Sequence, residues 1–166
     1  MGNDQNELQK ITVEVNTLLK EYFTLHDRYL DVAGKDSNRM LSKIKPGDYE
    51  SIYNKIIALT DKFVLMQSKM QDVANSNFLV YLTDEQKAFV TELNNYIYVL
   101  AKTSNLLAMI VELEFLRSMS KIDISAHEFS SKWKIYQDHC DNCRLDGIKI
   151  NNLYQKLYGQ SVLTIS

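Results

Sequence analysis

The sequence contains few of the residues that interrupt or crosslink a chain. Its 166 residues include one proline, Pro46, and five glycines. Because proline breaks helices and glycine weakens them, their scarcity favours long uninterrupted helices. The two cysteines are too few for a disulfide framework. We therefore expect both thiols to be reduced, as is usual in the cytoplasm.

The sequence also lacks a strong excess of one charge and a long apolar run. A formal net charge of −2 argues against a nucleic-acid partner, because phosphate binding needs an excess of lysine and arginine. The longest apolar run, Leu106 to Val111, is far shorter than the roughly 20 residues that cross a bilayer. No basic segment leads into an apolar stretch near the N-terminus, as a secretory signal requires. We expect a cytoplasmic protein that binds neither nucleic acid nor a membrane.

Three stretches carry apolar side chains at alternating steps of three and four residues. The first stretch is Leu8, Ile11, Val15, Leu18, Tyr22, Leu25, Tyr29 and Val32. The second is Tyr49, Ile52, Ile56, Leu59, Phe63, Met66, Met70 and Val73. The third is Phe129, Trp133, Tyr136, Cys140, Cys143, Gly147, Ile150, Tyr154 and Leu157. A mean step of about 3.5 places each set on one face of an α-helix, and such helices pack side by side.

This pattern predicts an all-α fold of four long antiparallel helices in an up-down-up-down bundle, forming a single domain over residues 1–166. We expect the helices at about residues 4–33, 49–74, 83–119 and 125–158. The alternative is an elongated helical hairpin that forms such a bundle as a homodimer.

Local signals support several of the helix ends. Gly34 stands where the first helix is expected to end. Thr83 with Gln86, and Ser125 with Glu128, have the spacing of capping boxes that open the third and fourth helices.

Two further expectations concern the connection after the first helix and the interior of the fourth. The connection at 35–48 contains Pro46, and its residues 38–44 can add one helical turn. Asp146-Gly147 can mark a turn that ends the fourth helix early, but the apolar repeat continues through Gly147, which favours a continuous helix. A glycine inside a helix can also introduce a kink there. The third helix carries two adjacent apolar stripes, so we expect it to contact the most neighbours.

One candidate partner-binding segment lies in the connection before the third helix. It consists of five consecutive apolar residues: Phe78, Leu79, Val80, Tyr81 and Leu82. Such a segment either caps the end of the core or is exposed as a site for a partner protein.

One end of the predicted bundle collects aromatic and titratable side chains. The candidate ligand-binding residues there are Tyr22, His26, Tyr49, Glu114, Trp133 and Tyr136. A mixture of flat and titratable side chains between helices can line a small-molecule pocket, or it can be core with tyrosine hydroxyls at the rim.

Polar residues interrupt the apolar stripes of the third helix. Glu114 either faces water near the helix end or is buried with a cationic partner, because an unpaired buried carboxylate is strongly unfavourable. Thr103 and Ser104 indicate either a close helix approach or hydroxyls bonded to the preceding turn.

The usual motifs of catalysis and metal binding are missing. Cys140 and Cys143 form the only C-x-x-C pair, and a structural zinc site usually needs a second pair. There is no Glu-x-x-His for a di-iron bundle, no glycine-rich phosphate loop and no Gly-x-Ser-x-Gly elbow. We therefore predict no catalytic residue, no metal and no cofactor.

Two functions follow from these observations. The first is a non-enzymatic interaction protein, such as an adaptor, a chaperone or an immunity-type binder of a protein partner. The second is a small-molecule binding or sensing bundle with its pocket at the aromatic-rich end.

Overall fold

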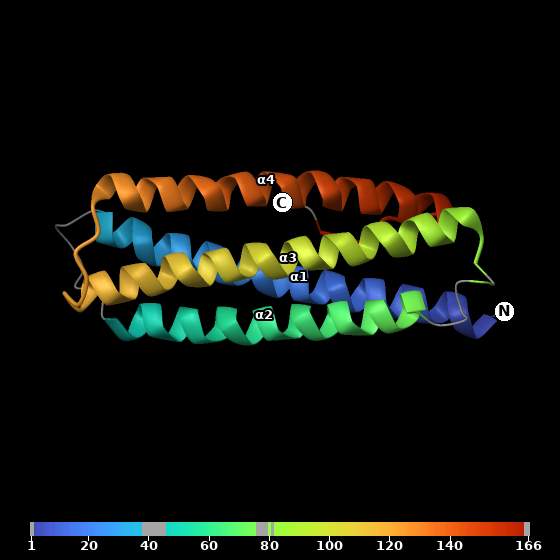
Figure 1. The fold of residues 1–166 in the computed structure, drawn as a ribbon, viewed down its shortest axis with the longest axis horizontal. Helices are drawn as coiled ribbons and strands as arrows, with labels where there is room; N and C mark the ends of the chain where they lie inside the picture. Colours follow the sequence, from blue (N-terminus) through green and yellow to red (C-terminus); the bar gives the residue numbers. More distant parts are fainter. Residues whose placement is uncertain (1, 38–45, 76–79, 81, 165–166) are drawn as a thin grey trace.

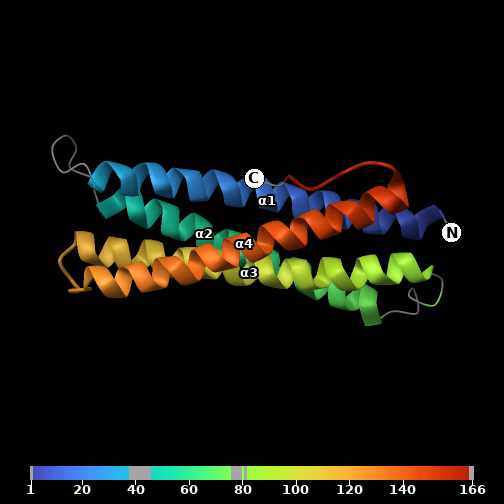
Figure 2. The same cartoon turned by 90° about the horizontal axis from the view of Figure 1, so that it is seen from above.

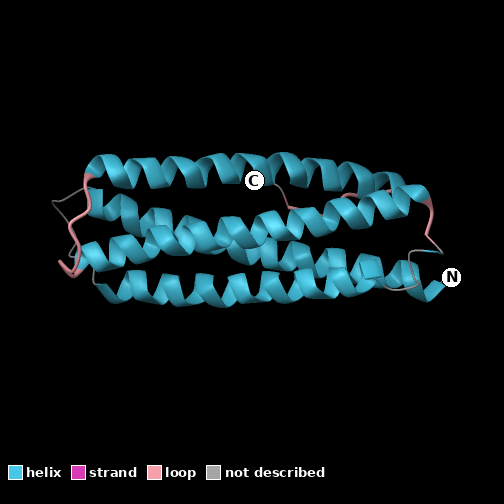
Figure 3. Ribbon diagram, in the orientation of Figure 1, coloured by secondary structure: helices cyan, strands magenta, loops and turns pink. Residues whose placement is uncertain are grey.

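The protein folds into four long helices that one chain supplies (Figures 1 and 3). The computed structural model describes residues 2–37, 46–75, 80 and 82–164. The helices are α1 (Gly2–Ser37), α2 (Pro46–Asn75), α3 (Asp84–Ser118) and α4 (Ala126–Tyr158). The chain reverses direction at each connection (Figure 1), and no strand occurs among the described residues. The prediction of an all-α bundle of four helices is confirmed.

Capping side chains define the starts of α3 and α4. The Thr83 hydroxyl accepts a hydrogen bond from the Gln86 amide at 3.3 Å, and the Thr83 amide donates to the Gln86 side chain at 3.0 Å. This reciprocal capping box satisfies two backbone donors that the first turn leaves without partners. Ser125 likewise accepts from the Glu128 amide at 3.1 Å.

Two predicted boundaries differ from the structure. Helix α1 continues past Gly34 to Ser37, because a single glycine weakens a helix by only about 1 kcal/mol and does not force its end. Helix α2 begins at Pro46, earlier than predicted, because proline is well suited to the first helical turn, where its missing amide hydrogen has no intrahelical acceptor. The extra turn predicted at 38–44 lies outside the described residues. Helix α4 runs through Gly147 without interruption.

The predicted apolar stripes form the core. In α1 the described stripe from Leu8 to Tyr29 is buried, and in α2 no stripe residue from Tyr49 to Met70 is more than 1% exposed. Helix α3 contacts the other three helices, as its two adjacent stripes predict. None of the helices, over the residues described, is long and apolar enough to cross a membrane.

The seam between α1 and α4 differs from the other seams of the bundle. Helices α2 and α3 share the most extensive contact, and α3 with α4 and α1 with α2 are also close. Helices α1 and α4 are not among the pairs that approach closely, and α4 runs obliquely across the bundle (Figure 2). This arrangement leaves room along the α1–α4 seam.

The residues after α4 return into that seam. Gly159 ends the helix in the left-handed conformation, with a φ of 76°, which glycine adopts without strain. Residues 159–164, which we name the C-terminal strap, then run back along α1 (Figure 2). Leu163 of the strap is buried in the core.

Candidate functional site: a groove between α1 and α4

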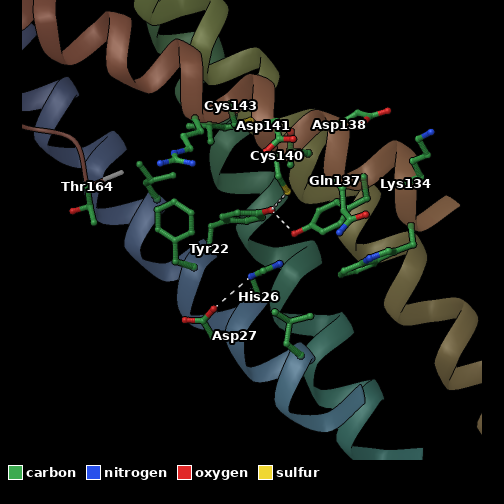
Figure 4. Close-up of a pocket in the computed structure, with 18 of the residues that line it drawn as sticks. Tyr22, His26, Asp27, Lys134, Gln137, Asp138, Cys140, Asp141, Cys143 and Thr164 are labelled. Atoms are coloured by element: carbon green, nitrogen blue, oxygen red, sulfur yellow. Dashed lines mark hydrogen bonds and ion pairs between the residues drawn. The ribbon is translucent and has the colours of Figure 1, made fainter. Parts of the chain in front are cut away.

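A groove with a volume of about 850 Å³ occupies the part of the α1–α4 seam that the strap leaves open (Figure 4). Helix α1 contributes an apolar and aromatic wall of Leu19, Tyr22, Phe23, His26 and Leu30. Helix α3 contributes Tyr96, Leu100 and Thr103, all buried. Helix α4 forms the opposite wall with Trp133, Tyr136, Cys140 and Cys143. The volume lies within the range of about 300–1,000 Å³ that is usual for small-molecule sites.

The groove is elongated along the helices and has two different ends. Along α1 it extends from Leu19 to Leu30, about 16 Å at the helical rise per residue. One end, the ring end, contains Trp133 and His26, and the other, the strap end, contains Leu19 and Thr164. The shape and the lining suit a long molecule more than a compact one.

A hydrogen bond between two tyrosine hydroxyls links α1 to α4 at the buried wall of the groove. The hydroxyls of Tyr22 and Tyr136 lie 2.6 Å apart, and the Tyr22 hydroxyl lies 3.6 Å from Cys140 Sγ. Figure 4 shows Tyr22 and Cys140 next to each other at the centre of the site. Tyr136 also packs its ring 5.2 Å from that of Trp133, which extends the aromatic surface toward the ring end.

Burial keeps the Tyr22, Tyr136 and Cys143 side chains protonated. It raises the pKa of Tyr22 and of Tyr136 well above the usual value, and the neighbouring Cys140 adds to both shifts. Burial also raises the pKa of Cys143 from 9.0 to about 12, although the nearby Thr103 hydroxyl opposes this shift. At neutral pH these three side chains are uncharged, so the wall is a neutral surface with a few hydrogen-bonding atoms.

Charged side chains are confined to the mouth of the groove. The acidic residues there are Asp27, Asp138 and Asp141, and the basic ones are Lys134 and Arg144, all exposed. His26 Nδ1 lies 3.5 Å from Asp27 Oδ1 at this rim. A neutral interior below a mixed-charge rim favours a ligand with an apolar body, because burying a charge against the interior would be unfavourable.

The structure brings four of the six predicted ligand-binding residues together. Tyr22, His26, Trp133 and Tyr136 all line the groove. Tyr49, in contrast, is a core residue of α2 with 1% exposure and does not line it.

Glu114, the other predicted residue outside the groove, is buried near the end of α3. It is 6% exposed, and its Oε2 lies 2.8 Å from an Arg117 guanidinium nitrogen. Arg117 also lies over the Phe129 ring at 5.6 Å from the centroid. The alternative in which Glu114 faces water is therefore wrong. The ion pair with Arg117 compensates a large part of the hydration that the buried carboxylate loses. Burial, and then the charges of Glu114 and Tyr49, raise the pKa of the neighbouring Tyr29.

The hydroxyls that interrupt the stripes of α3 serve both roles that the sequence indicated. Thr103 Oγ1 donates to the Val99 carbonyl at 2.9 Å and lies 3.1 Å from Cys143 Sγ on α4. Ser104 Oγ lies 2.8 Å from Thr60 Oγ1 on α2. Small hydroxyl side chains thus mark the places where α3 approaches both neighbours.

The predicted partner-binding segment is described only in part. Val80 is 76% exposed, whereas Leu82 is buried against the core at 8%. Phe78, Leu79 and Tyr81 lie outside the described residues. The two described side chains therefore point to different environments.

The sequence did not predict most of the residues that line the groove. Phe23, Leu30, Leu100 and Cys140 line it, but their periodicity alone marks them as helix faces and not as a site. The strap carried one signal that our sequence prediction did not use, the apolar pair Val162-Leu163 after Gly159.

The groove provides chemistry suited to binding. Within the part of the chain that the structure describes, no three His, Cys, Asp or Glu side chains are placed to hold a metal ion together. Both cysteines are free thiols.

No protein family, no curated protein and no solved structure matches this chain.

Proposed function

We propose that this protein is a non-enzymatic binding protein and that the α1–α4 groove holds a small, elongated, largely apolar molecule with a flat ring. The single observation that carries the proposal is the groove itself, about 850 Å³ in volume and lined by aromatic and aliphatic side chains from three helices. A site of this volume with a few polar atoms is typical of small-molecule binding.

The position of the ring follows from the aromatic side chains. Trp133 is half-buried and its ring faces Tyr136 at 5.2 Å and Tyr29 at 6.0 Å. A further ring placed beside Trp133 would gain both apolar burial and the offset or edge contacts that aromatic rings prefer. The ring end is therefore the place for the flat part of the ligand.

The protonation state of the buried wall supports binding over catalysis. An efficient general acid or base has a pKa near the working pH, whereas Tyr22, Tyr136 and Cys143 have pKa values raised away from neutrality. The two free thiols also support the cytoplasm as the location, because reducing compartments keep thiols free.

A titration with 4-butylphenol tests the proposal. This probe has a flat ring and a short apolar chain and is uncharged at neutral pH. Trp133 is the only tryptophan, so its fluorescence on excitation at 295 nm reports on the ring end directly, and calorimetry gives the affinity. We expect saturable binding with a change in Trp133 emission.

A matched pair of variants locates the binding. Cys140→Phe fills the groove from a half-buried lining position, and Asn142→Phe places the same side chain at an exposed position two residues away. We expect the first variant to weaken binding at least about tenfold and the second to leave it unchanged. Equal affinities for the two variants, or no saturable binding to the unmodified protein, would contradict the proposal.

A second candidate function is the capture of a protein partner at the connection before α3. It is favoured by Val80, whose apolar side chain is 76% exposed. Val80→Asp should then keep the helical fold but lose a partner that co-purifies from the native host, while Ala88→Asp, at an exposed position on α3, should retain it. Retention of the partner by both variants would exclude this surface.

A further inference from the structure

The strap is held in the α1–α4 seam as an extended peptide segment. The Asn151 side chain accepts hydrogen bonds from the Val162 and Leu163 amides at 3.1 and 2.7 Å, and it donates to the Leu163 carbonyl at 2.9 Å. On the opposite side of the seam, Asn16 accepts from the Thr164 amide at 2.7 Å. These bonds fix the strap through its backbone.

The seat of the strap is continuous with the groove. Thr164 belongs to the strap and also lines the groove, and Figure 4 places it at one edge of the site. Asn16, which holds Thr164, lies three residues before Leu19 at the strap end. The seam is therefore one channel in which the chain itself fills one part and the groove is the other.

The environment of Leu163 shows which chemical group fits the part of the seam that the strap fills. Its side chain is 6% exposed and belongs to the buried core, although the residues on either side are less buried. An aliphatic chain is the chemical group that such a seat accommodates, since the gain comes from removing methylene groups from water.

We propose that the binding site extends beneath the strap, and that its ligands are molecules with a ring and a linear alkyl chain whose far end takes the place of Leu163. The inference rests on the proposed function, because the ring must first occupy the end that contains Trp133. The ring then lies between α1 and α4 at Trp133, the chain follows Leu19 and Leu100, and longer chains reach the seat of Leu163.

A homologous series of 4-alkylphenols, from ethyl to octyl, tests this inference. Each methylene that enters an apolar site is expected to raise the affinity about fourfold. For the unmodified protein we expect this rise to continue while the chain fills the groove and then to flatten, because a longer chain must displace Leu163 and the loss of the strap's contacts offsets the further gain. Beyond that length, the amide resonances of Leu163 and Thr164 should shift on binding.

Two variants open the seat and one serves as the control. Asn151→Ala removes three of the bonds to the strap, and Leu163→Ala empties the seat without touching them. In both variants the affinity should keep rising as the alkyl chain becomes longer. Their affinity for 4-octylphenol should be at least about fourfold higher than that of the unmodified protein. Asn152→Ala, at the exposed neighbouring position, should behave like the unmodified protein. Circular dichroism confirms that each variant retains its helices.

The outcomes separate the two proposals. If no alkylphenol binds the unmodified protein, the proposed function fails, and this inference fails with it. If the alkylphenols bind but the affinity flattens at the same chain length in all four proteins, the proposed function stands and the inference is overturned. The inference would also be overturned if the affinity of the unmodified protein rose steadily up to 4-octylphenol while the Leu163 and Thr164 amide resonances stayed unshifted.

Discussion

The α2–α3 seam and the α1–α4 seam follow from similar apolar repeats but pack differently. Helix α2 buries every stripe residue from Tyr49 to Met70 to within 1% exposure. In α4, by contrast, the stripe residues Phe129, Trp133 and Cys140 are only half-buried. The first seam is a filled core, and the second is shared between a groove and the strap.

The size of the side chains explains this difference. In the middle of α4 the stripe consists of the small residues Cys140, Cys143 and Gly147, where α2 has large aliphatic and aromatic residues. Small side chains let α4 approach α3 closely, as the 3.1 Å contact between Thr103 and Cys143 shows. They also leave space on the α1 side. A repeat therefore fixes which face is buried, and side-chain volume decides which seam stays open.

The largest effect is expected in the filled seam. Phe63→Ala removes a fully buried ring and leaves a cavity, so the free energy of unfolding should fall by about 3–5 kcal/mol. Leu65→Ala, on the same helix but at a side chain that is 61% exposed, should change it by less than about 0.5 kcal/mol. Urea denaturation followed by circular dichroism measures both. Similar losses for the two variants would mean that this seam is not the filled core described above.

The second effect is a loss of stability at alkaline pH that arises at the α1–α4 seam. Cys143 has a pKa of about 12 in the folded protein and 9.0 as its ordinary value, so the folded state holds its proton more tightly. Its contribution is fully present below pH 9 and is lost as the pH rises, by about 2 kcal/mol between pH 9 and 11. The buried tyrosines Tyr22 and Tyr136 add to this loss above pH 10.

Denaturation at a series of pH values measures this loss. Cys143→Ala removes the thiol and should make the decline between pH 9 and 10 smaller by about 1 kcal/mol, because the contribution of the buried tyrosines is the same in both proteins. A decline that is equally steep in that variant would show that Cys143 is not the group responsible.

A smaller effect on stability is expected for the hydrogen bond between Tyr22 and Tyr136, which spans the α1–α4 seam. Tyr136→Phe and Tyr22→Phe each remove one hydroxyl of the 2.6 Å pair and should each lower the free energy of unfolding by about 1 kcal/mol. The double variant should lose less than the sum, because no buried hydroxyl is then left without its partner. Strictly additive losses in this double-mutant cycle would show that the two hydroxyls do not interact.

The smallest effect is expected for an exposed ion pair between α1 and α2. Lys62 Nζ lies 2.8 Å from Glu21 Oε2, and both side chains are more than 40% exposed. Glu21→Gln should therefore change the free energy of unfolding by about 0.5 kcal/mol or less, and the difference should diminish at high salt. A larger effect that persists at high salt would indicate that this seam depends on charge more than its exposure suggests.

The sequence predicted the fold because the fold depends on short-range patterns. The three-four repeats identified the buried faces of α1, α2 and α4, and the pair Thr83 and Gln86 identified the start of α3. The end of α1 and the start of α2 were less predictable. A single glycine costs too little to end α1 at Gly34, and proline, which breaks a helix in its interior, is well suited to the first turn of α2.

The site was less predictable because it depends on the distances between helices. Tyr22 and Tyr136 were predicted to lie together, since both follow the stripes of helices that meet at one end. Glu114 and Tyr49 were assigned to the same site, but both are buried in the core near Tyr29 and neither lines the groove. A heptad-like pattern specifies a face on each helix, but it does not specify which two helices stand apart.

The left-handed turn at Gly159 has a practical consequence for the placement of a fused reporter. Because the chain doubles back there, Thr164 lies beside Asn16 near the middle of α1, whereas the start of α1 lies at a tip of the bundle (Figure 1). A fluorescent reporter joined directly after Thr164 would emerge beside the groove mouth and compete for space with any ligand. The same addition before Gly2 would project away from the groove, so biosensors and purification handles belong at the start of α1.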